Sequence, residues 1–309
     1  MKITRREFTK QLGGLGVGGV LAFGGGRLAG EEKPGSGAEP EKQSTVGQTK
    51  LRTLGKTGLK LSPVGFGAQR TRDADLIRYA LDQGMNHIET AWSYGFGRPG
   101  NSCECIGKAI AGRRDSICLA VAYEAAPRPT SKAWLANQFE QTLRDLGTDH
   151  IDIFLWHDPS GNMVNHHQTT FKENQALVTS GDRVDLMLQW KKAGKIRFCG
   201  LSSHFEQPEC LKFVLQSEYY DVAVVAFNYN GPAAIAKALQ EASQKGIGLI
   251  AMKTQSPHIF DGEVTIGDAP DHRAALNWVL SKNYITAAIP GMTARSQVDL
   301  NVKIMNSMA

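Results

Sequence analysis

Short runs of apolar residues recur along most of the chain, and longer stretches with helical spacing separate them. Runs of this length, bounded by glycine, proline or polar residues, are typical of buried strands. The predicted strands are Val64–Ala68, Met85–Thr90, Ile117–Ala122, Ile151–Trp156, Ile196–Leu201, Val222–Phe227, Gly248–Met252 and Ile285–Ile289.

Between these runs, apolar residues at intervals of three and four predict amphipathic helices. Gly84 follows one such stripe and Gly147 another, and glycine is common just beyond a helix C-terminus. The two stripes are Leu76, Ile77, Ala80 and Leu81, and Leu135, Phe139, Leu143 and Leu146.

Eight strands that alternate with helices favour an α/β fold, a parallel eight-stranded (β/α)8 TIM barrel. The alternative is a doubly wound sheet, which would need a glycine-rich phosphate loop after its first strand. Residues 69–72 there read Gln-Arg-Thr-Arg, so we set this alternative aside. Leu51–Leu61 predicts a hairpin before the barrel, with two short strands around a Lys-Thr-Gly turn.

The chain divides into three predicted segments. Residues 1–30 form a twin-arginine signal segment, in which Arg5 and Arg6 precede Phe8 and Lys10 and a glycine-rich apolar run follows. That run is too short and too rich in glycine for a stable membrane span. Residues 31–50 are polar and predict a flexible linker, and residues 51–309 form the barrel. An exported protein, periplasmic or extracellular, is therefore expected, with the export machinery as a partner.

Composition narrows the choice of partners. Hydrophobic residues make up 41% of the 309-residue chain and charged residues 21%, which is typical of a globular protein. The net charge is +5, and residues 1–30 contribute five basic and one acidic residue, so that +4 belongs to them and +1 to the rest. A nearly neutral body gives no electrostatic reason to expect nucleic-acid binding.

Two further features carry weaker signals. The five cysteines lack the spacing of a disulfide framework or of a zinc site, and we predict no metal centre. Residues 158–182 lack strong periodicity and follow the fourth predicted strand, so we interpret them as a loop that covers the barrel mouth.

Five motifs, in order along the chain, resemble those of the aldo/keto reductase family, and the first of them, Leu54–Leu59, resembles its opening segment. Gly84–Gly95 resembles the second-strand signature of that family, although Glu89 stands where the family has aspartate. The other three motifs are Leu146–His157 around the fourth strand, Gly194–Ser203 around the fifth, and Ile289–Met292 with Asn301 after the eighth. The resemblance implies a barrel whose active site lies at the C-terminal ends of the strands.

The resemblance also implies a reaction, the reduction of a carbonyl to an alcohol or the reverse. Tyr94 occupies the position of the proton donor, His157 that of the residue that orients the carbonyl, and Glu89 that of the acid. In the family a lysine on the third strand lowers the pKa of the tyrosine. That position falls on Ala122, and the third strand contains no lysine. Arg70 or Arg72 could supply a cation instead.

The implied cofactor is NADP(H), with NAD(H) as the alternative. Its expected contacts come from the ends of the fifth, seventh and eighth strands and from the helix after the eighth. They are Ser202, Ser203, Met252, Lys253, Gly291, Met292, Gln297 and Asn301. Because the lysine is missing, a second hypothesis remains, in which the barrel is catalytically impaired or inactive and binds a ligand or partner in the cell envelope.

Overall fold

The structure is a computed structural model that describes residues 49–95, 100–125, 131–159, 170–255 and 271–307. The predicted signal segment and nearly all of the predicted linker lie outside the described residues. Within the described part, no helix combines the length and the apolar character that crossing a bilayer requires.

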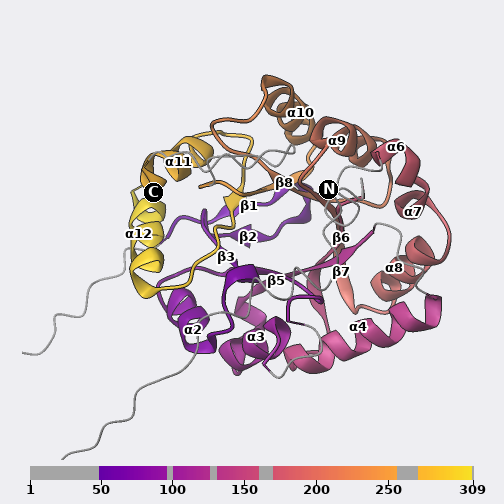
Figure 1. The fold of residues 1–309 in the computed structure, drawn as a ribbon, viewed down its shortest axis with the longest axis horizontal. Coiled ribbons are helices and arrows are strands. Elements are labelled where there is room, and N and C mark those ends of the chain that lie inside the picture. Colours follow the sequence, from indigo (N-terminus) through magenta and orange to yellow (C-terminus); the bar gives the residue numbers. More distant parts are fainter. Residues whose placement is uncertain (1–48, 96–99, 126–130, 160–169, 256–270, 308–309) are drawn as a thin grey trace, which may run out of the picture. The chain divides into compact units, whose positions relative to one another are not determined.

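Eight parallel strands form the centre of the molecule, as predicted (Figure 1). They pair in the order in which they occur along the chain. The strands are β3 Phe66–Gly67, β4 His87–Ala91, β5 Cys118–Glu124, β6 Ile151–His157, β7 Ile196–Ser203, β8 Val222–Ala226, β9 Gly248–Met252 and β10 Ala287–Ala288.

The first and last strands close the ring at a seam between β3 and β10. There Gly65 N donates to Ala288 O at 2.8 Å, and Gly67 N donates to Pro290 O at 3.1 Å. A Cβ atom on Gly67 would lie 2.7 Å from the Ile289 carbonyl oxygen, so only glycine allows the backbones to approach this closely. Closure places the C-terminal ends of all eight strands on one rim.

Helices surround the strands on the outside (Figure 1). The two predicted stripes lie on α2 and α4, and Gly147 ends α4 in the left-handed conformation as expected. The helices are α2 Ala74–Asp82, α3 Ser102–Ile110, α4 Lys132–Leu146, α6 Phe171–Asn174, α7 Ala176–Thr179, α8 Asp182–Lys192, α9 Gln207–Gln216, α10 Ala233–Gln244, α11 His272–Leu280 and α12 Arg295–Asn306.

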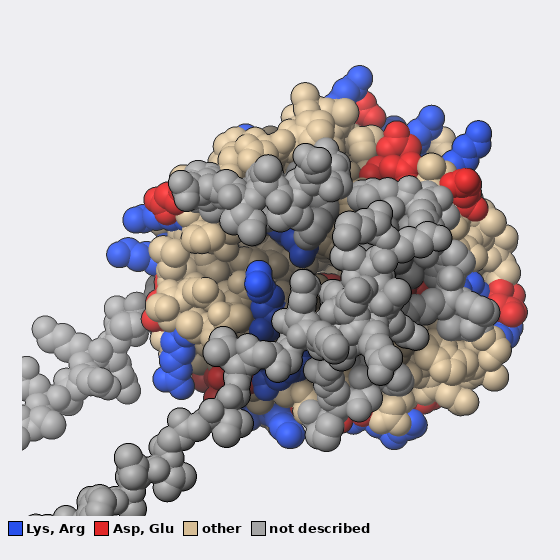
Figure 2. Space-filling view, viewed as in Figure 1, with Lys and Arg blue, Asp and Glu red and all other residues tan. Residues whose placement is uncertain are grey.

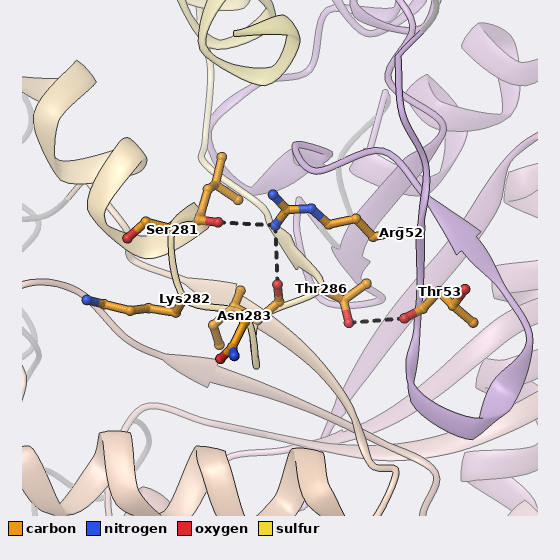
Figure 3. Close-up of a pocket in the computed structure, with 8 residues that line it drawn as sticks. Arg52, Thr53, Ser281, Lys282, Asn283 and Thr286 are labelled. Carbon is orange, nitrogen blue, oxygen red and sulfur yellow. Dashed lines mark hydrogen bonds between the residues drawn. The ribbon is translucent and has the colours of Figure 1, made fainter. Parts of the chain in front are cut away.

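The predicted hairpin is also present, as the antiparallel pair β1 Arg52–Thr53 and β2 Lys60–Leu61. Its contacts are with the N-terminal side of the barrel. Arg52 donates from Nη1 to the carbonyl oxygens of Leu280 and Ile285, at 3.2 and 3.4 Å (Figure 3). These bonds attach the hairpin to the segment between α11 and β10.

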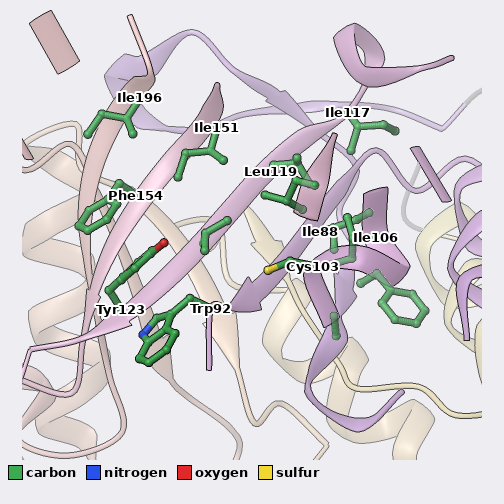
Figure 4. Packing of buried hydrophobic residues seen from close by; sticks show 14 of the residues in the cluster. Ile88, Trp92, Cys103, Ile106, Ile117, Leu119, Tyr123, Ile151, Phe154 and Ile196 are labelled. Atoms are coloured by element: carbon green, nitrogen blue, oxygen red, sulfur yellow. The ribbon is translucent and has the colours of Figure 1, made fainter. Parts of the chain in front are cut away.

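Successive side chains along each strand point alternately to the inside and the outside of the barrel, which divides the core into an inner and an outer layer. On β5, Cys118, Ala120 and Ala122 belong to the inner apolar cluster, while Leu119 and Tyr123 pack outward. Figure 4 shows this outer layer, which β4, β5 and β6 share with α3. The inner residues are small on β5, so the interior of the barrel has room near its rim.

The structure corrects the prediction in detail. Several strands begin or end up to two residues from the predicted bounds, and β6 includes His157 itself. The described part of residues 158–182 is not an irregular loop, because α6 and α7 lie within it. Phe171 and Val178 of these short helices are buried, so local packing rather than periodicity orders them.

A buried acid ties three strands together at the N-terminal side of the barrel. Asp152 accepts from Arg114 Nη2 at 2.9 Å, from Arg197 Nη1 at 2.5 Å and from the Leu119 backbone N–H at 2.9 Å. Its side chain is only 3% exposed. Removing the carboxylate would leave the buried Leu119 N–H without its acceptor and would take away the charge partner of Arg114, whose side chain is only 16% exposed.

We therefore expect Asp152→Ala to lower the free energy of unfolding by about 3 kcal/mol, measured by urea denaturation. Asp149→Ala is the matched control, because its carboxylate is 94% exposed and its loss should change little. Equal stability of the two variants would contradict this account of the Asp152 network.

Candidate active site

A cavity of about 880 Å³ opens at the C-terminal ends of the strands. The face shown in Figure 2 is hollowed near its centre, and Lys and Arg side chains gather at the hollow. The residues that line the cavity are Gly67, Gln69, Arg70, Glu89, Tyr94, His157, His204, Met252, Lys253, Thr254, Gln255, His272, Ile289, Pro290, Gly291, Thr293, Gln297, Leu300 and Asn301.

Tyr94 lies on a turn that follows β4, and hydrogen bonds hold that turn in place. Its backbone N–H donates to Ala91 O at 3.1 Å, and its carbonyl accepts from Ser102 N at 3.0 Å. Trp92 Nε1 donates to the Glu124 carboxylate at 2.6 Å, and the Ser93 hydroxyl donates to the other carboxylate oxygen at 2.5 Å. Glu124 thereby connects this turn to the end of β5.

His157 is the last residue of β6 and lines the same cavity as Tyr94. Its Nδ1 lies 2.9 Å from Ser202 Oγ. The His204 ring meets it edge to face, with 5.2 Å between the ring centroids. Burial lowers the pKa of His157, and the nearby Asp158 and Glu124 carboxylates oppose that shift. The imidazole is therefore neutral near pH 7 and has one N–H to donate.

Glu89, on β4, and Lys253, at the end of β9, line the same cavity. Burial raises the pKa of Glu89 to about 7, and the Lys253 ammonium opposes this rise. Burial lowers the pKa of Lys253, and Glu89 opposes that change in turn. Each group thus favours the charged form of the other.

The electrostatic surroundings of Tyr94 do not lower its pKa, as the surroundings of a tyrosine that acts as an acid at neutral pH would. Burial raises the pKa of Tyr94 well above 10, and the Glu89 and Glu124 carboxylates raise it further. Arg72 is a cation that opposes this rise. Its guanidinium lies beside the Tyr94 turn, because a Cβ atom on Gly95 would be 3.0 Å from Arg72 Nε. Of the two arginines considered from the sequence, Arg72 is therefore the one that acts on Tyr94.

The residues predicted to bind the cofactor divide into two groups. Met252, Lys253, Gly291, Gln297 and Asn301 line the cavity with the three predicted catalytic residues. Ser202, Ser203 and Met292 are buried and lie outside its lining.

The hydroxyls of the two serines are used within the protein. Ser202 pairs with His157, and Ser203 donates to the Phe205 carbonyl and accepts from the Phe205 backbone N–H at 3.2 Å. The structure therefore shows Ser202 as a support for the His157 ring.

Sequence reasoning missed several residues that line the cavity, among them Gln69 and His204. Both follow the end of a barrel strand, which is the signal that could have identified them. Arg70 was considered only as a cation for Tyr94. In the structure its Cγ and Cδ lie 3.3 Å from the position of a Cβ on Gly291, so Arg70 packs at the β10 side of the cavity.

Comparison with known proteins agrees with this architecture. The model of the aldo/keto reductase family matches residues 63–272, which is more than half of the chain. The chain therefore belongs to the aldo/keto reductase family, a family of oxidoreductases.

Two individual relatives show how far the sequence similarity extends. Aldo-keto reductase YhdN of Bacillus subtilis is 30% identical over 49% of this chain and 46% of its own length, so this match spans less than half of that protein. L-glyceraldehyde 3-phosphate reductase of Escherichia coli is 22% identical over 88% of this chain and 91% of its own length.

Solved structures of low sequence identity share the fold. The holo form of an aldo-keto reductase from Bacillus halodurans superimposes with a TM-score of 0.64 at 22% identity, covering 83% of this chain and 90% of that one. An aldo/keto reductase from Klebsiella pneumoniae, in complex with NADP and acetate, has a TM-score of 0.61 at 21% identity and covers 84% and 90%.

The raised pKa of Glu89 predicts a pH-dependent stability. The folded protein holds the carboxyl proton more tightly than the unfolded chain, whose reference pKa is 4.5. The contribution of Glu89 to stability is therefore fully present below pH 4.5 and is lost as the pH rises through about 7. Relative to Glu89→Gln, we expect the wild type to lose on the order of 3 kcal/mol between pH 4.5 and pH 8.

Urea denaturation across this pH range measures the difference. Glu218→Gln is the matched control, since this exposed side chain lies outside the cavity and the variant should follow the wild type. Parallel pH profiles for the wild type and Glu89→Gln would show that Glu89 ionises normally in the folded protein.

Proposed function

We propose that this chain is an NADP(H)-dependent oxidoreductase that reduces a small carbonyl compound to an alcohol, or catalyses the reverse. The observation that carries this proposal is that Tyr94, on the turn after β4, and His157, at the end of β6, line one cavity. A phenol can give a proton to a carbonyl oxygen, and a neutral imidazole can donate a hydrogen bond to the same oxygen.

The cavity fits a phosphorylated dinucleotide on its β10 side. Helix α12 begins there, and its N-terminus has no side-chain cap, so backbone N–H groups are available to an anion. Gln297 accepts from Thr293 N at 2.7 Å and orders the loop before the helix. Arg70, Gly291 and Asn301 would also face the phosphates, and Met252 the nicotinamide. The Klebsiella relative solved with NADP supports this choice over NAD(H).

When bound, the cofactor supplies the hydride for the carbonyl carbon, and the protein supplies the proton for the oxygen. In the proposal Tyr94 donates that proton from its hydroxyl, and His157 orients the oxygen. If Ser202 donates to His157 Nδ1, the single imidazole proton lies on Nε2 and is available for the substrate. The Glu89 carboxylate contributes negative charge, which favours a cation in the same cavity.

A second candidate function is a barrel that binds a ligand without turnover. Ala122 favours it, because this residue is buried in the inner cluster where the family resemblance places a lysine. The raised pKa of Tyr94 favours it as well. Turnover by the purified protein separates the two candidates.

NADPH titration and a panel of aldehydes and ketones test the main proposal. We expect NADPH binding, followed by fluorescence, and oxidation of NADPH with at least one carbonyl. Tyr94→Phe should lower kcat by at least about 100-fold with little change in the NADPH affinity, because only the proton donor is removed. Tyr284→Phe is the control, since Tyr284 precedes β10 at the opposite end of the barrel. A folded protein that binds no NADPH would contradict the proposal.

We also propose that the chain is exported by the twin-arginine route, on the basis of Arg5 and Arg6. This route transports folded proteins and would suit a protein that acquires its cofactor in the cytoplasm. Replacing both arginines by lysine should retain the protein in the cytoplasm, as measured by immunoblots of cell fractions. Arg27→Lys, outside the motif, should leave export unchanged. Full export of the double variant would refute the route.

A further inference from the structure

Two basic side chains of the described residues line the cavity, Arg70 and Lys253. Arg70 packs against Gly291 at the β10 side, where the cofactor phosphates are proposed to bind. Lys253 follows β9 and lines the cavity together with Glu89, Tyr94 and His157. Its Nζ lies 3.5 Å from Gln69 Oε1, a residue just beyond β3. The Lys253 ammonium therefore reaches past β10 to the segment that follows β3.

The backbone at Lys253 explains how this side chain reaches the cavity. Met252 is an inward-facing residue of β9, so in a regular strand its neighbour would face outward. Lys253 instead has φ 57°, in the left-handed region that a residue with a side chain rarely adopts. Its carbonyl accepts from Asn228 Nδ2 at 3.3 Å. This turn allows two consecutive side chains, Met252 and Lys253, to line the same cavity.

Glu89 is an acid that lines the same cavity as this lysine. It has one methylene more than the aspartate of the family pattern, so its carboxylate reaches further across the barrel. Lys253 and Glu89 each shift the pKa of the other toward the charged form, and Lys253 also lowers the pKa of His157. The positive charge of Lys253 thus acts on two of the groups proposed to carry the reaction.

Ala122 is the small inner residue of β5 at the position where the family resemblance places a lysine. It is 1% exposed, and Tyr94 packs against the inner cluster to which Ala122 belongs. A lysine on β5 would place its positive charge in the same interior that Lys253 reaches from β9. The chain therefore departs from the family pattern at Ala122 and at Glu89, and it carries a lysine, Lys253, in the lining of the same cavity as Glu89.

We propose that Lys253 supplies from β9 the catalytic cation that the third barrel strand lacks, with Glu89 as its partner, and that it stabilises the negative charge that develops on the carbonyl oxygen. This inference rests on the proposed carbonyl reduction. An ammonium group is suited to the role because a charge that develops in a water-poor site interacts strongly with a fixed cation.

The pairing itself can be tested without cofactor or substrate. In protein labelled with 13C at the glutamate carboxyl carbons, the Glu89 resonance is assigned by its loss in Glu89→Gln and followed as a function of pH. We expect an apparent pKa of about 7 in the wild type and a higher value in Lys253→Met. Lys237→Met, on the exposed face of α10, should leave the titration unchanged. An unchanged Glu89 titration in Lys253→Met would overturn the pairing.

Kinetics test the catalytic role. Lys253→Met should lower kcat by about 100-fold or more, as removal of one group that stabilises an oxyanion commonly does. Lys253→Arg should retain part of the activity because it keeps the charge. The double variant Lys253→Met with Ala122→Lys should regain at least about tenfold over Lys253→Met, because it returns a cation to the same interior.

The outcomes distinguish this inference from the proposed function. If the wild type neither binds NADPH nor reduces any carbonyl, the proposed function fails, and the Glu89 titration still reports on the pair. If the wild type is active and Lys253→Met has a kcat within about threefold of it, the catalytic role is refuted while the function stands. A double variant that binds NADPH but is no more active than Lys253→Met would overturn the claim that the cation has moved from β5 to β9.

Discussion

The backbone hydrogen bonds between β3 and β10 are the interaction on which the rest of the structure depends. They join the first and the last strand of the barrel over only a few residues, with Gly65 and Gly67 donating and Ala288 accepting and donating. Without this closure the eight strands would form an open sheet, and the side chains of β4 and β9 would lie far apart. With it, Glu89 and Lys253 act on each other across one interior.

The backbone departs from regular geometry on the same rim as the cavity. In the described part of the chain, the residues other than glycine with positive φ are Asp158, Glu206 and Lys253. Each of them follows the C-terminal end of a barrel strand, after β6, β7 and β9 respectively. Backbone strain of this kind tends to occur at functional sites. Here it occurs on the rim that bears the cavity, whereas the hydrogen-bonded body of each strand remains regular.

The sequence was sufficient to predict the barrel, since eight apolar runs with intervening helical stripes leave few other folds. It was also sufficient to predict that Glu89, Tyr94 and His157 lie on one rim, because each lies at or near the end of a strand. The sequence did not show how the side chains at a strand end bond within the protein. Ser202 and Ser203 lie at a strand end too, but their hydroxyls bond to His157 and to the backbone of Phe205. Which way a side chain points at a strand end depends on the following turn.

The environment of Lys253 was not predictable from the sequence for the same reason, since it too depends on the turn that follows a strand. Its place after β9 was evident, but the left-handed turn that brings it beside Met252 in the cavity was not. The short helices α6 and α7 escaped prediction for a different reason. Each is four residues long, too short for helical periodicity to appear, and the burial of Phe171 and Val178 against the rest of the protein orders them.

The geometry of a barrel makes the position of a charge more important than the strand that carries it. Every strand end on the rim lies at a similar distance from the barrel axis, so a side chain from one wall can reach the space that a side chain from another wall leaves. Ala122 removes a long side chain from β5, while Lys253 adds a cation from β9 and Glu89 extends toward it. In our proposal, Lys253 thus provides the cation that β5 lacks. A search along β5 alone would interpret this chain as inactive, whereas the three-dimensional arrangement retains an acid, a cation, a phenol and an imidazole around one cavity.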